Sequence, residues 1–361
     1  MARPSQARLD LCALRHNVEV ARSLAPDSRL MAVVKANAYG HGAAVIAGEL
    51  APLVDALAVA CIEEAIALRD HGIKTPILLL QGVFEAAELS VAAQLDLWVT
   101  IANEQQLCWL EQARLVQPLQ CWLKLDTGMH RLGVTSGNVD AFHRRLQACK
   151  QARPEPVLCT HFAAADDLQG EQTGAQLAEF ERLCADLPGA RSAANSAAVM
   201  AWPAAHCDWI RPGYMLYGNS PLPAAHPNSE KLRPVMTLGS AITGLRDVAP
   251  GETVGYGATW MARRPSRIAT VTIGYGDGYP RQAPNGTPVL VAGQRATLAG
   301  RVSMDMITVD VTDLPGVAIG DEVTLWGAGL PVDEVARHVQ TIGYELTTRM
   351  PARTPRIVTV A

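Results

Sequence analysis

Residues 30–35, LMAVVK, form a short apolar run that ends in a lysine, and similar runs recur as far as Arg211. Amphipathic stretches with helical spacing separate the runs, for example at 62–71, 103–115 and 171–185. Eight strand candidates with seven intervening helical segments predict an α/β fold, a (β/α)8 barrel of the TIM type. An open doubly wound sheet is the alternative that this pattern leaves open. The eight runs begin near Leu30, Asp55, Ile77, Leu95, Leu119, Pro156, Arg191 and Asp208.

The sequence changes in character after Lys231, where short strand-like segments are separated by Gly and Pro. One short helical segment, 332–339, interrupts them. A chain of 361 residues is long enough for two domains. We therefore expect the barrel to occupy residues 1–230 and a mostly β domain to occupy residues 231–361. The strand-like segments are 267–273, 287–291, 306–311 and 322–326.

Composition and charge exclude several classes of protein. With 18% charged and 49% hydrophobic residues, the chain carries too little charge to be disordered. The net charge of −4 offers no attraction to nucleic acid or to an anionic membrane, and no apolar run approaches the roughly 20 residues of a membrane span. The N-terminal stretch contains no signal-peptide segment, and the eight cysteines form no Cys-x-x-Cys pair. We expect a cytoplasmic protein with free thiols and no metal site.

A lysine at the end of an apolar strand, such as Lys35, has two interpretations. It can extend its charged head into water, or, when desolvated, it can lose its proton and act as a nucleophile. The following residues favour the second interpretation, because 34–42, VKANAYGHG, resembles the pyridoxal-phosphate attachment motif of the alanine racemase family. The resemblance continues along essentially the whole chain. It implies that Lys35 binds pyridoxal phosphate covalently and also acts as a catalytic base.

The end of the fifth predicted strand contains a second family segment, 124–133, KLDTGMHRLG. Alone, its Asp-Thr-Gly would be an ordinary turn. In the family, the arginine that corresponds to Arg131 approaches the phenolic oxygen of the cofactor and the substrate carboxylate. A guanidinium suits that role because it stays charged and offers forked donors. Lys124 matches a position that is a carbamylated lysine in some members, and the sequence leaves open whether it is modified here.

Three further predicted strand ends would complete the cofactor site. The resemblance implies that His161 lies near the pyridine ring and hydrogen-bonds Arg211, and that Ser196 holds the phosphate. Phosphate sites of barrel enzymes cluster after strands 7 and 8, so the fold prediction and the resemblance agree. Tyr344 would also narrow the pocket around the methyl group of alanine. The other groups implied at the cofactor are Tyr39, Asn195, Gly213 and Tyr214.

Arg211 is informative about the type of reaction. Pyridoxal-phosphate enzymes that need a strong electron sink place a carboxylate beside the pyridine nitrogen and so keep it protonated. Arginine does not give up its proton, so a ring nitrogen that faces Arg211 stays unprotonated and the electron sink is weaker. Reprotonation at the wrong carbon, which would give transamination, then becomes less favourable. This chemistry suits a racemase.

Residues 254–260, VGYGATW, contain a tyrosine that alone would be a β-turn residue. The segment resembles the family motif with the second catalytic base, here Tyr256. Inversion needs a proton removed from one face of Cα and returned to the other, and Lys35 occupies only one face. Tyrosine titrates at about 10 in water, so Tyr256 needs cationic neighbours such as His161 and Arg211 to act as a base.

The resemblance also implies the substrate contacts and the assembly. Tyr275 would line the substrate entrance, and the Met304 backbone would contact the substrate carboxylate. Tyr256 would reach the barrel mouth of the partner subunit, so that a head-to-tail homodimer shares its active sites. The substrate would be alanine, and the sequence does not distinguish production of D-alanine as a peptidoglycan precursor from its consumption.

Three alternatives remain open. A related decarboxylase of the barrel-plus-β type would carry an acid as the partner of the ring nitrogen, where this chain has Arg211. A broader-specificity racemase of the same fold is closer, but such proteins are typically exported. A non-catalytic pyridoxal-phosphate carrier would end after about 230 residues and would lack Tyr256.

Overall fold

The eight predicted strands form a parallel sheet in which the first seven pair in the order in which they follow along the chain. The sheet closes on itself, because the first strand also pairs with the last, and the last two are joined by Asp208 N–Arg191 O and Arg211 N–Ala194 O hydrogen bonds of 3.1 and 2.9 Å. This confirms the barrel and excludes the open sheet. The strands are β2 (Arg29–Val33), β3 (Ala56–Val59), β4 (Ile77–Leu79), β5 (Leu97–Ile101), β6 (Cys121–Lys124), β7 (Val157–Cys159), β8 (Arg191–Ser192) and β9 (Trp209–Ile210).

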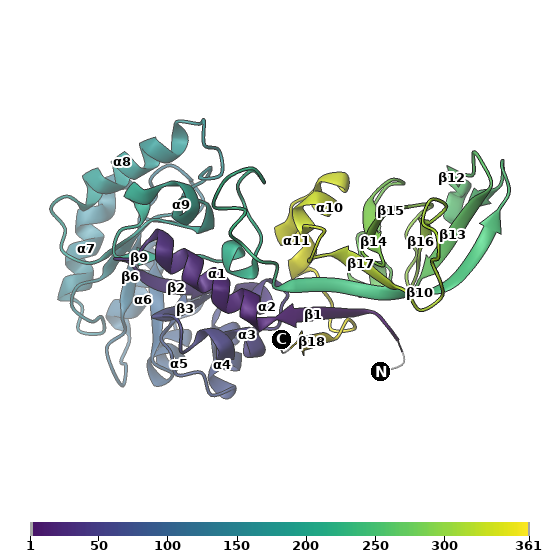
Figure 1. The fold of residues 1–361 in the computed structure, drawn as a ribbon. Coiled ribbons are helices and arrows are strands. Elements are labelled where there is room, and N and C mark those ends of the chain that lie inside the picture. The colour runs from purple at the N-terminus through teal and green to yellow at the C-terminus, as the bar shows by residue number, and fades with distance from the viewer. Residues whose placement is uncertain (1–2, 360–361) are drawn as a thin grey trace.

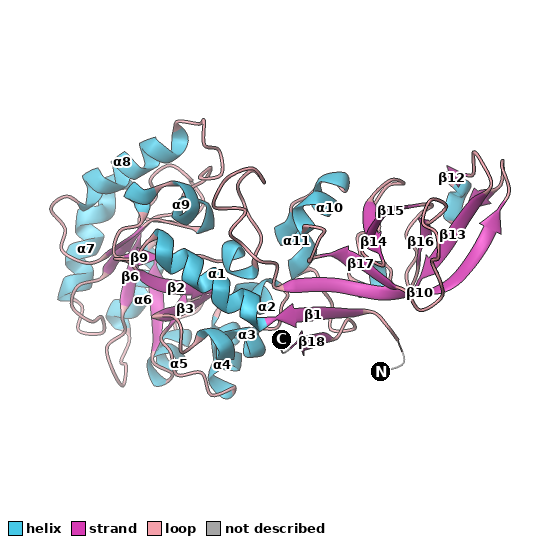
Figure 2. Ribbon diagram, in the orientation of Figure 1, coloured by secondary structure: helices cyan, strands magenta, loops and turns pink. Residues whose placement is uncertain are grey.

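Helices surround this barrel in the computed structural model, which describes residues 3–359 (Figure 1, Figure 2). Each turns an apolar stripe inward; in α7 the buried residues Val139, Phe142, His143 and Leu146 recur at intervals of three and four. Side-chain oxygens cap several N-termini, as Asp10 does by accepting a 2.9 Å hydrogen bond from Ala13 N. The helices are α1 (Leu11–Leu24), α3 (Ala43–Leu50), α4 (Ile62–Asp70), α5 (Glu88–Gln94), α6 (Glu104–Gln112), α7 (Val139–Ala148), α8 (Gln172–Cys184) and α9 (Ser196–Ala201).

The C-terminal part of the chain is a mostly antiparallel β domain with helices α10 (Val332–His338) and α11 (Gly343–Thr348) beside the barrel (Figure 1). This confirms the predicted fold class. The four predicted strand segments are present, but the longest strand, β10, was not predicted. The strands are β10 (Met236–Val248), β11 (Thr253–Val254), β12 (Trp260–Met261), β13 (Ser266–Val271), β14 (Pro288–Val291), β15 (Gln294–Leu298), β16 (Ile307–Asp310), β17 (Glu322–Trp326) and β18 (Arg356–Thr359).

An N-terminal strand, β1 (Gln6–Asp10), lies in the sheet of the β domain. It pairs antiparallel with β10 and parallel with β18, and its buried residues Ala7 and Leu9 belong to the apolar core of that sheet. A separate core fills the barrel. The division of the chain near residue 230 remains a prediction. It assigns Gln6–Asp10 to the barrel, whereas in the structure this segment pairs within the sheet of the β domain.

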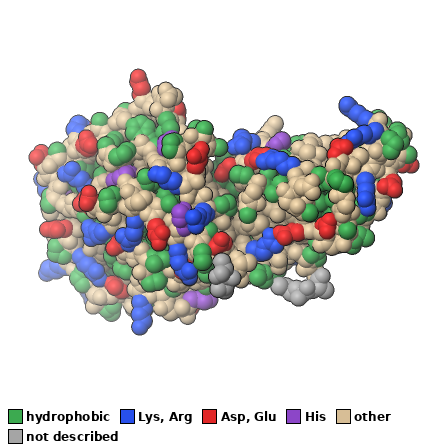
Figure 3. Space-filling model, viewed as in Figure 1, with side chains coloured by type: hydrophobic (Ala, Val, Ile, Leu, Met, Phe, Trp, Pro, Cys, Tyr) green, Lys and Arg blue, Asp and Glu red, His purple; other side chains and the backbone are tan. Residues whose placement is uncertain are grey.

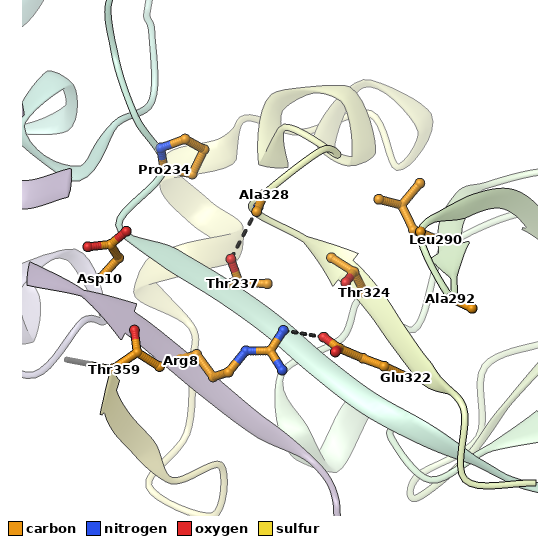
Figure 4. A pocket seen from close by; sticks show the side chains of 11 residues that line it. Arg8, Asp10, Pro234, Thr237, Leu290, Ala292, Glu322, Thr324, Ala328 and Thr359 are labelled. Atoms are coloured by element: carbon orange, nitrogen blue, oxygen red, sulfur yellow. Dashed lines mark hydrogen bonds and ion pairs between the residues drawn. The ribbon is translucent and has the colours of Figure 1, made fainter. Parts of the chain in front are cut away.

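A cavity of about 420 Å³ lies where β1 and β10 run toward the barrel (Figure 4). Its lining includes the ion pair of Arg8 with Glu322, together with Asp10, Thr237 and Thr359. None of the predicted site residues lines this cavity. Positive and negative side chains are interspersed over the visible face of the molecule (Figure 3). Within residues 3–359 no helix is both long and apolar enough to span a membrane.

Candidate active site

Lys35 follows β2 at the barrel mouth and begins a left-handed turn. The next four residues, 36–39, all have positive φ, between 51° and 55°. This conformation costs about 1–2 kcal/mol per non-glycine residue, so the surroundings must hold it in place. Asn37 Oδ1 accepts a 2.7 Å hydrogen bond from Ala43 N, and the buried His41 Nδ1 donates to two carbonyls of the turn at 3.0 and 3.1 Å. A strained backbone segment therefore lies directly beside the lysine that is predicted to bind the cofactor.

Glu64 of α4 fixes the backbone next to Lys35. One carboxylate oxygen accepts from Ala36 N at 2.6 Å and the other accepts from Ala60 N at 2.8 Å. Burial lowers the pKa of the Lys35 amine, and the charge of Arg131 lowers this pKa further, whereas Glu64 raises it. A lowered pKa favours the neutral amine, which both a nucleophile and a general base require.

Basic side chains concentrate at the C-terminal ends of neighbouring barrel strands. Burial lowers the pKa of Lys124 to about 7, with smaller contributions from Arg211 and Arg131. Burial also lowers the pKa of His161 well below its usual value, and the charges of Lys124, Arg211, Arg131 and Lys35 act in the same direction. Mutual repulsion of this kind is relieved by an anion, so the site favours a ligand with negative charges.

Arg211 is buried just after β9 and is held by three acceptors. Its guanidinium donates to Ser192 Oγ and to the carbonyls of Thr160 at 2.6 Å and Ala193 at 3.3 Å. Among residues 3–359, neutral oxygens hold it in place and no carboxylate accepts from it. The described hydrogen bonds of Arg211 do not include the bond to His161 that the resemblance implied.

A second cluster, suited to a phosphate, lies after β8 and β9. Ser196 Oγ accepts from Gly213 N at 2.9 Å and from Met215 N at 3.3 Å. A Cβ atom on Gly213 would lie 2.5 Å from the Tyr39 hydroxyl, so the absence of a side chain there lets Tyr39 approach the backbone. Hydroxyl and amide groups thus converge at the place where barrel enzymes bind phosphate. Asn195 caps α9 by accepting a 3.1 Å hydrogen bond from Ala198 N.

The β domain of the same chain adds an aromatic wall to the barrel mouth. Tyr344 of α11 stacks on Tyr214 with ring centroids 3.6 Å apart, and its ring lies 6.2 Å from that of Tyr39. The Tyr214 hydroxyl donates to Asp333 at 2.8 Å. Burial raises the pKa of all three phenols, which therefore remain hydrogen-bond donors at neutral pH.

Tyr256, Tyr275 and Met304 lie on the β domain and are 69%, 41% and 52% exposed. Backbone hydrogen bonds join the loops of the last two, including Gly276 N–Met304 O at 2.9 Å. Tyr256 lies in the segment between β11 and β12. Figure 1 shows β12 at the end of the β domain away from the barrel, whereas α2 (Lys35–Tyr39), which begins with Lys35, lies where the two domains meet. One chain therefore does not bring Tyr256 to Lys35.

Comparison with known proteins identifies the family. Residues 9–221 match the family described as alanine racemase, N-terminal domain, and residues 235–358 match alanine racemase, C-terminal domain. The chain belongs to the alanine racemase family. An alanine racemase of Chromohalobacter salexigens is 52% identical over 99% of this chain and 98% of that protein, and a biosynthetic alanine racemase of Pseudomonas aeruginosa is 53% identical over 98% and 99%. The crystal structure of the biosynthetic alanine racemase from Pseudomonas aeruginosa superimposes with a TM-score of 0.95 at 52% identity, covering 99% of this chain and 100% of that chain.

The comparisons confirm the resemblance read from the sequence, and the structure shows how the family fold arranges the predicted residues. It gathers most of them around the barrel mouth, from Lys35 to the aromatic wall. It leaves three of them, Tyr256, Tyr275 and Met304, on the surface of the β domain. The roles assigned to these residues remain predictions.

Sequence reasoning missed residues that support the site. Glu64 holds the backbone after Lys35, and Ser192 accepts from Arg211. Glu64 lies in the first turn of α4, the helix after the next strand. An acidic residue at that position is also explained by its favourable interaction with the helix N-terminus, so the sequence gives no sign of a role at the site. Only the closed barrel shows that its carboxylate meets the neighbouring strand end.

Proposed function

We propose that the chain interconverts L-alanine and D-alanine with pyridoxal phosphate as its cofactor. The observation that carries the proposal is the cluster of buried basic groups around Lys35, adjacent to the hydroxyl and amide groups of Ser196, Gly213 and Tyr39. A ligand with a phosphate at one end and further anionic oxygen atoms would satisfy both clusters. The names of the relatives support this assignment.

The residues present fit pyridoxal phosphate. Ser196, Tyr39 and the backbone of Gly213 and Tyr214 would hold the phosphate, and Lys35 would form the covalent link. Arg131 would face the phenolic oxygen, His161 would lie near the ring, and Arg211 would face the ring nitrogen. When bound, the cofactor withdraws electrons from Cα of an attached amino acid and makes its proton acidic.

Arg211 would limit how strongly the ring withdraws electrons. The guanidinium keeps its proton, so it would donate a hydrogen bond to the ring nitrogen without protonating it. Its bonds to Thr160, Ala193 and Ser192 fix the orientation of the guanidinium. This arrangement favours return of a proton to Cα over transamination, and it argues against the decarboxylase alternative.

Two bases on opposite faces of Cα would carry out the inversion. The buried Lys35 amine, with its lowered pKa, would accept or return a proton on one face. Tyr256 would serve the other face from the partner subunit of a homodimer, because within one chain the neighbouring strand β12 and the helix α2, which begins with Lys35, lie at opposite ends of the β domain (Figure 1). The exposure of Tyr256, Tyr275 and Met304 supports this arrangement, since all three would meet the partner's barrel mouth.

The same residues would set the substrate. Arg131 and the Met304 backbone would bind the carboxylate, Tyr275 would line the entrance, and Tyr344 would limit the space beside Cβ. A small side chain such as the methyl group of alanine suits this site, and a broader-specificity racemase is the alternative for the assay to test. We further infer a cytoplasmic enzyme whose product can serve as a peptidoglycan precursor.

The test is to add pyridoxal phosphate and either enantiomer of alanine to the purified protein and to follow optical rotation. Rotation should decay to zero from both enantiomers, because they have equal free energy in water. Lys35→Ala should lose this activity and should retain no covalently attached cofactor after borohydride reduction. Lys74→Ala, at an exposed lysine, should keep both the activity and the attached cofactor. Retention of covalent cofactor by Lys35→Ala would contradict the assignment of Lys35. Release of CO2 without racemisation would favour the decarboxylase.

A further inference from the structure

The left-handed turn after Lys35 is tied to the C-terminal domain by one arginine. Arg356 of β18 donates to Gly40 O through Nε at 3.1 Å and through Nη2 at 2.9 Å. Its other N–H groups donate to Pro351 O at 2.6 Å, Thr354 O at 2.9 Å and Met350 O at 2.7 Å. All five guanidinium donors are therefore used, on four carbonyls from both domains.

The setting of Arg356 indicates a structural role for these bonds. Burial lowers the pKa of its guanidinium, and in the described part of the chain no carboxylate offsets that effect. A half-buried cation held by carbonyls alone uses its forked shape, which a lysine with three donors cannot reproduce. The acceptor in the barrel is the carbonyl next to Tyr39, at the end of the turn that begins with Lys35.

A close approach of the backbone reinforces the contact. Gly40 has φ of 83°, and a Cβ atom on it would collide with the Thr347 carbonyl of α11. The turn thus lies directly against the helix that carries Tyr344. Arg356 and α11 hold the turn from the side of the C-terminal domain, while His41 and Asn37 hold it from within the barrel.

We propose that Arg356 is a positioning residue for the cofactor site. It keeps the left-handed turn in the one conformation that presents the Lys35 amine and the Tyr39 hydroxyl together. Without it, the turn would spend time in less strained conformations, and cofactor binding would have to restore the left-handed one. Cofactor affinity would then depend on the contact between the two domains. This inference rests on the proposed function, because it takes pyridoxal phosphate as the ligand.

The experiment compares Arg356→Gln and Arg356→Lys with Arg69→Gln as a matched control. Arg69 is also half-buried, and burial lowers its pKa too. It donates to four carbonyls, those of Leu95, Ile73, Thr75 and Asp96, which precede β4 and β5 at the opposite end of the barrel. Arg356→Gln and Arg69→Gln therefore lose comparable sets of hydrogen bonds, but only Arg356 contacts the left-handed turn.

The first readout is the dissociation constant of pyridoxal phosphate, measured by absorbance after removal of the cofactor and titration. We expect it to rise about tenfold in Arg356→Gln and by less in Arg356→Lys, and to stay within about twofold of wild type in Arg69→Gln. The second readout is hydrogen exchange in the cofactor-free protein. The amides of residues 38 and 40–42, which donate to backbone carbonyls of residues 34–38, should exchange faster in the Arg356 variants and not in Arg69→Gln.

Wild-type affinity and wild-type protection of the amides of residues 38 and 40–42 in folded Arg356→Gln would overturn the proposal. Equal losses in Arg356→Gln and Arg69→Gln would also overturn it, because they would reflect general destabilisation. If wild-type protein binds no pyridoxal phosphate, the proposed function fails. The exchange measurement then still decides whether Arg356 holds the turn. If Arg356→Gln does not fold, Arg356→Lys supplies both readouts.

Discussion

Burial changes the protonation of the Lys124 amine. With a pKa of about 7 in the folded protein, against about 10.5 for an exposed lysine, a large fraction is neutral at neutral pH. Only a neutral amine adds CO2, so the neutral fraction, and with it carbamate formation, increases as pH rises through about 7. A carbamate would place a negative charge beside Arg131 and Arg211 and would relieve their repulsion.

We therefore predict that Lys124 is carbamylated. Protein equilibrated with 13C-bicarbonate should give a carbamate NMR signal that strengthens from pH 6 to pH 8 and is absent from Lys124→Met. Lys74→Met, at an exposed lysine, is the control and should keep the signal. A wild-type spectrum without this signal across the range would show that Lys124 stays a free amine.

Tyr256→Phe should impair the two directions by different routes, because only one face of Cα loses its base. In deuterated water, label should still enter D-alanine through Lys35, while conversion to L-alanine collapses. The assignment of Lys35 to D-alanine follows the family resemblance. Equal loss of exchange from both enantiomers would mean that Tyr256 is not a face-specific base.

At the scale of elements, the phosphate site depends on how closely β9 and the left-handed turn approach each other. Gly213→Ala should weaken pyridoxal-phosphate binding, because the new Cβ would lie 2.5 Å from the Tyr39 hydroxyl. Tyr39→Phe should also weaken it, by removing a phosphate donor. The double variant should lose less binding free energy for pyridoxal phosphate than the two single variants lose together, since removing the hydroxyl makes room for the methyl group. Additive losses, measured as dissociation constants, would show that the two groups do not meet.

The sequence predicts the barrel well because its strands are buried on both faces and read as apolar runs such as 30–35 and 77–79. It did not reveal β10, in which Gly and polar residues interrupt the alternation expected of a strand. Membership of β1 in the distant sheet depends on pairing with β10, and β18 then pairs with β1 at the sheet edge; no local pattern encodes partners so far along the chain. The positions of Lys35 and Arg211 at strand ends were also predictable, because each residue lies at the end of one of these apolar runs.

The supporting contacts of the site could not be predicted in this way. Glu64 and Arg356 act on backbone atoms, which carry no residue-specific signal in the sequence. The positive φ of residues 36–39 was equally hidden, because these positions are not glycines. Such features arise only when the closed barrel and the second domain bring separate segments together.

The shape of the whole molecule leads to a prediction about assembly. If each site takes Lys35 from one chain and Tyr256 from the other, inactive Lys35→Ala and Tyr256→Phe chains should complement each other. Unfolded together in equal amounts and refolded, they should form about half hybrid dimers, each with one intact site. The mixture should recover about a quarter of wild-type activity.

Differential affinity tags on the two variants would isolate the hybrid dimers and confirm that they form. Purified hybrids without activity would contradict a shared site and would leave the racemase proposal standing. Each variant refolded alone is the control for residual activity. Activity that appears only in the isolated hybrid would locate the two bases on different chains.

The pairing of β1 with β18 has a consequence for how the protein is made. The ribosome synthesises β1 long before β18, and β10 emerges only after the whole barrel. During translation the barrel can therefore close while β1 waits as a bare strand with unpaired N–H and C=O groups. An unpaired edge is a site where chains aggregate, so a nascent chain that stalls within the β domain should be a target for chaperones. β1 thus gains its first neighbour only when β10 has been made and its second only when β18 has been made, although it is itself among the earliest strands.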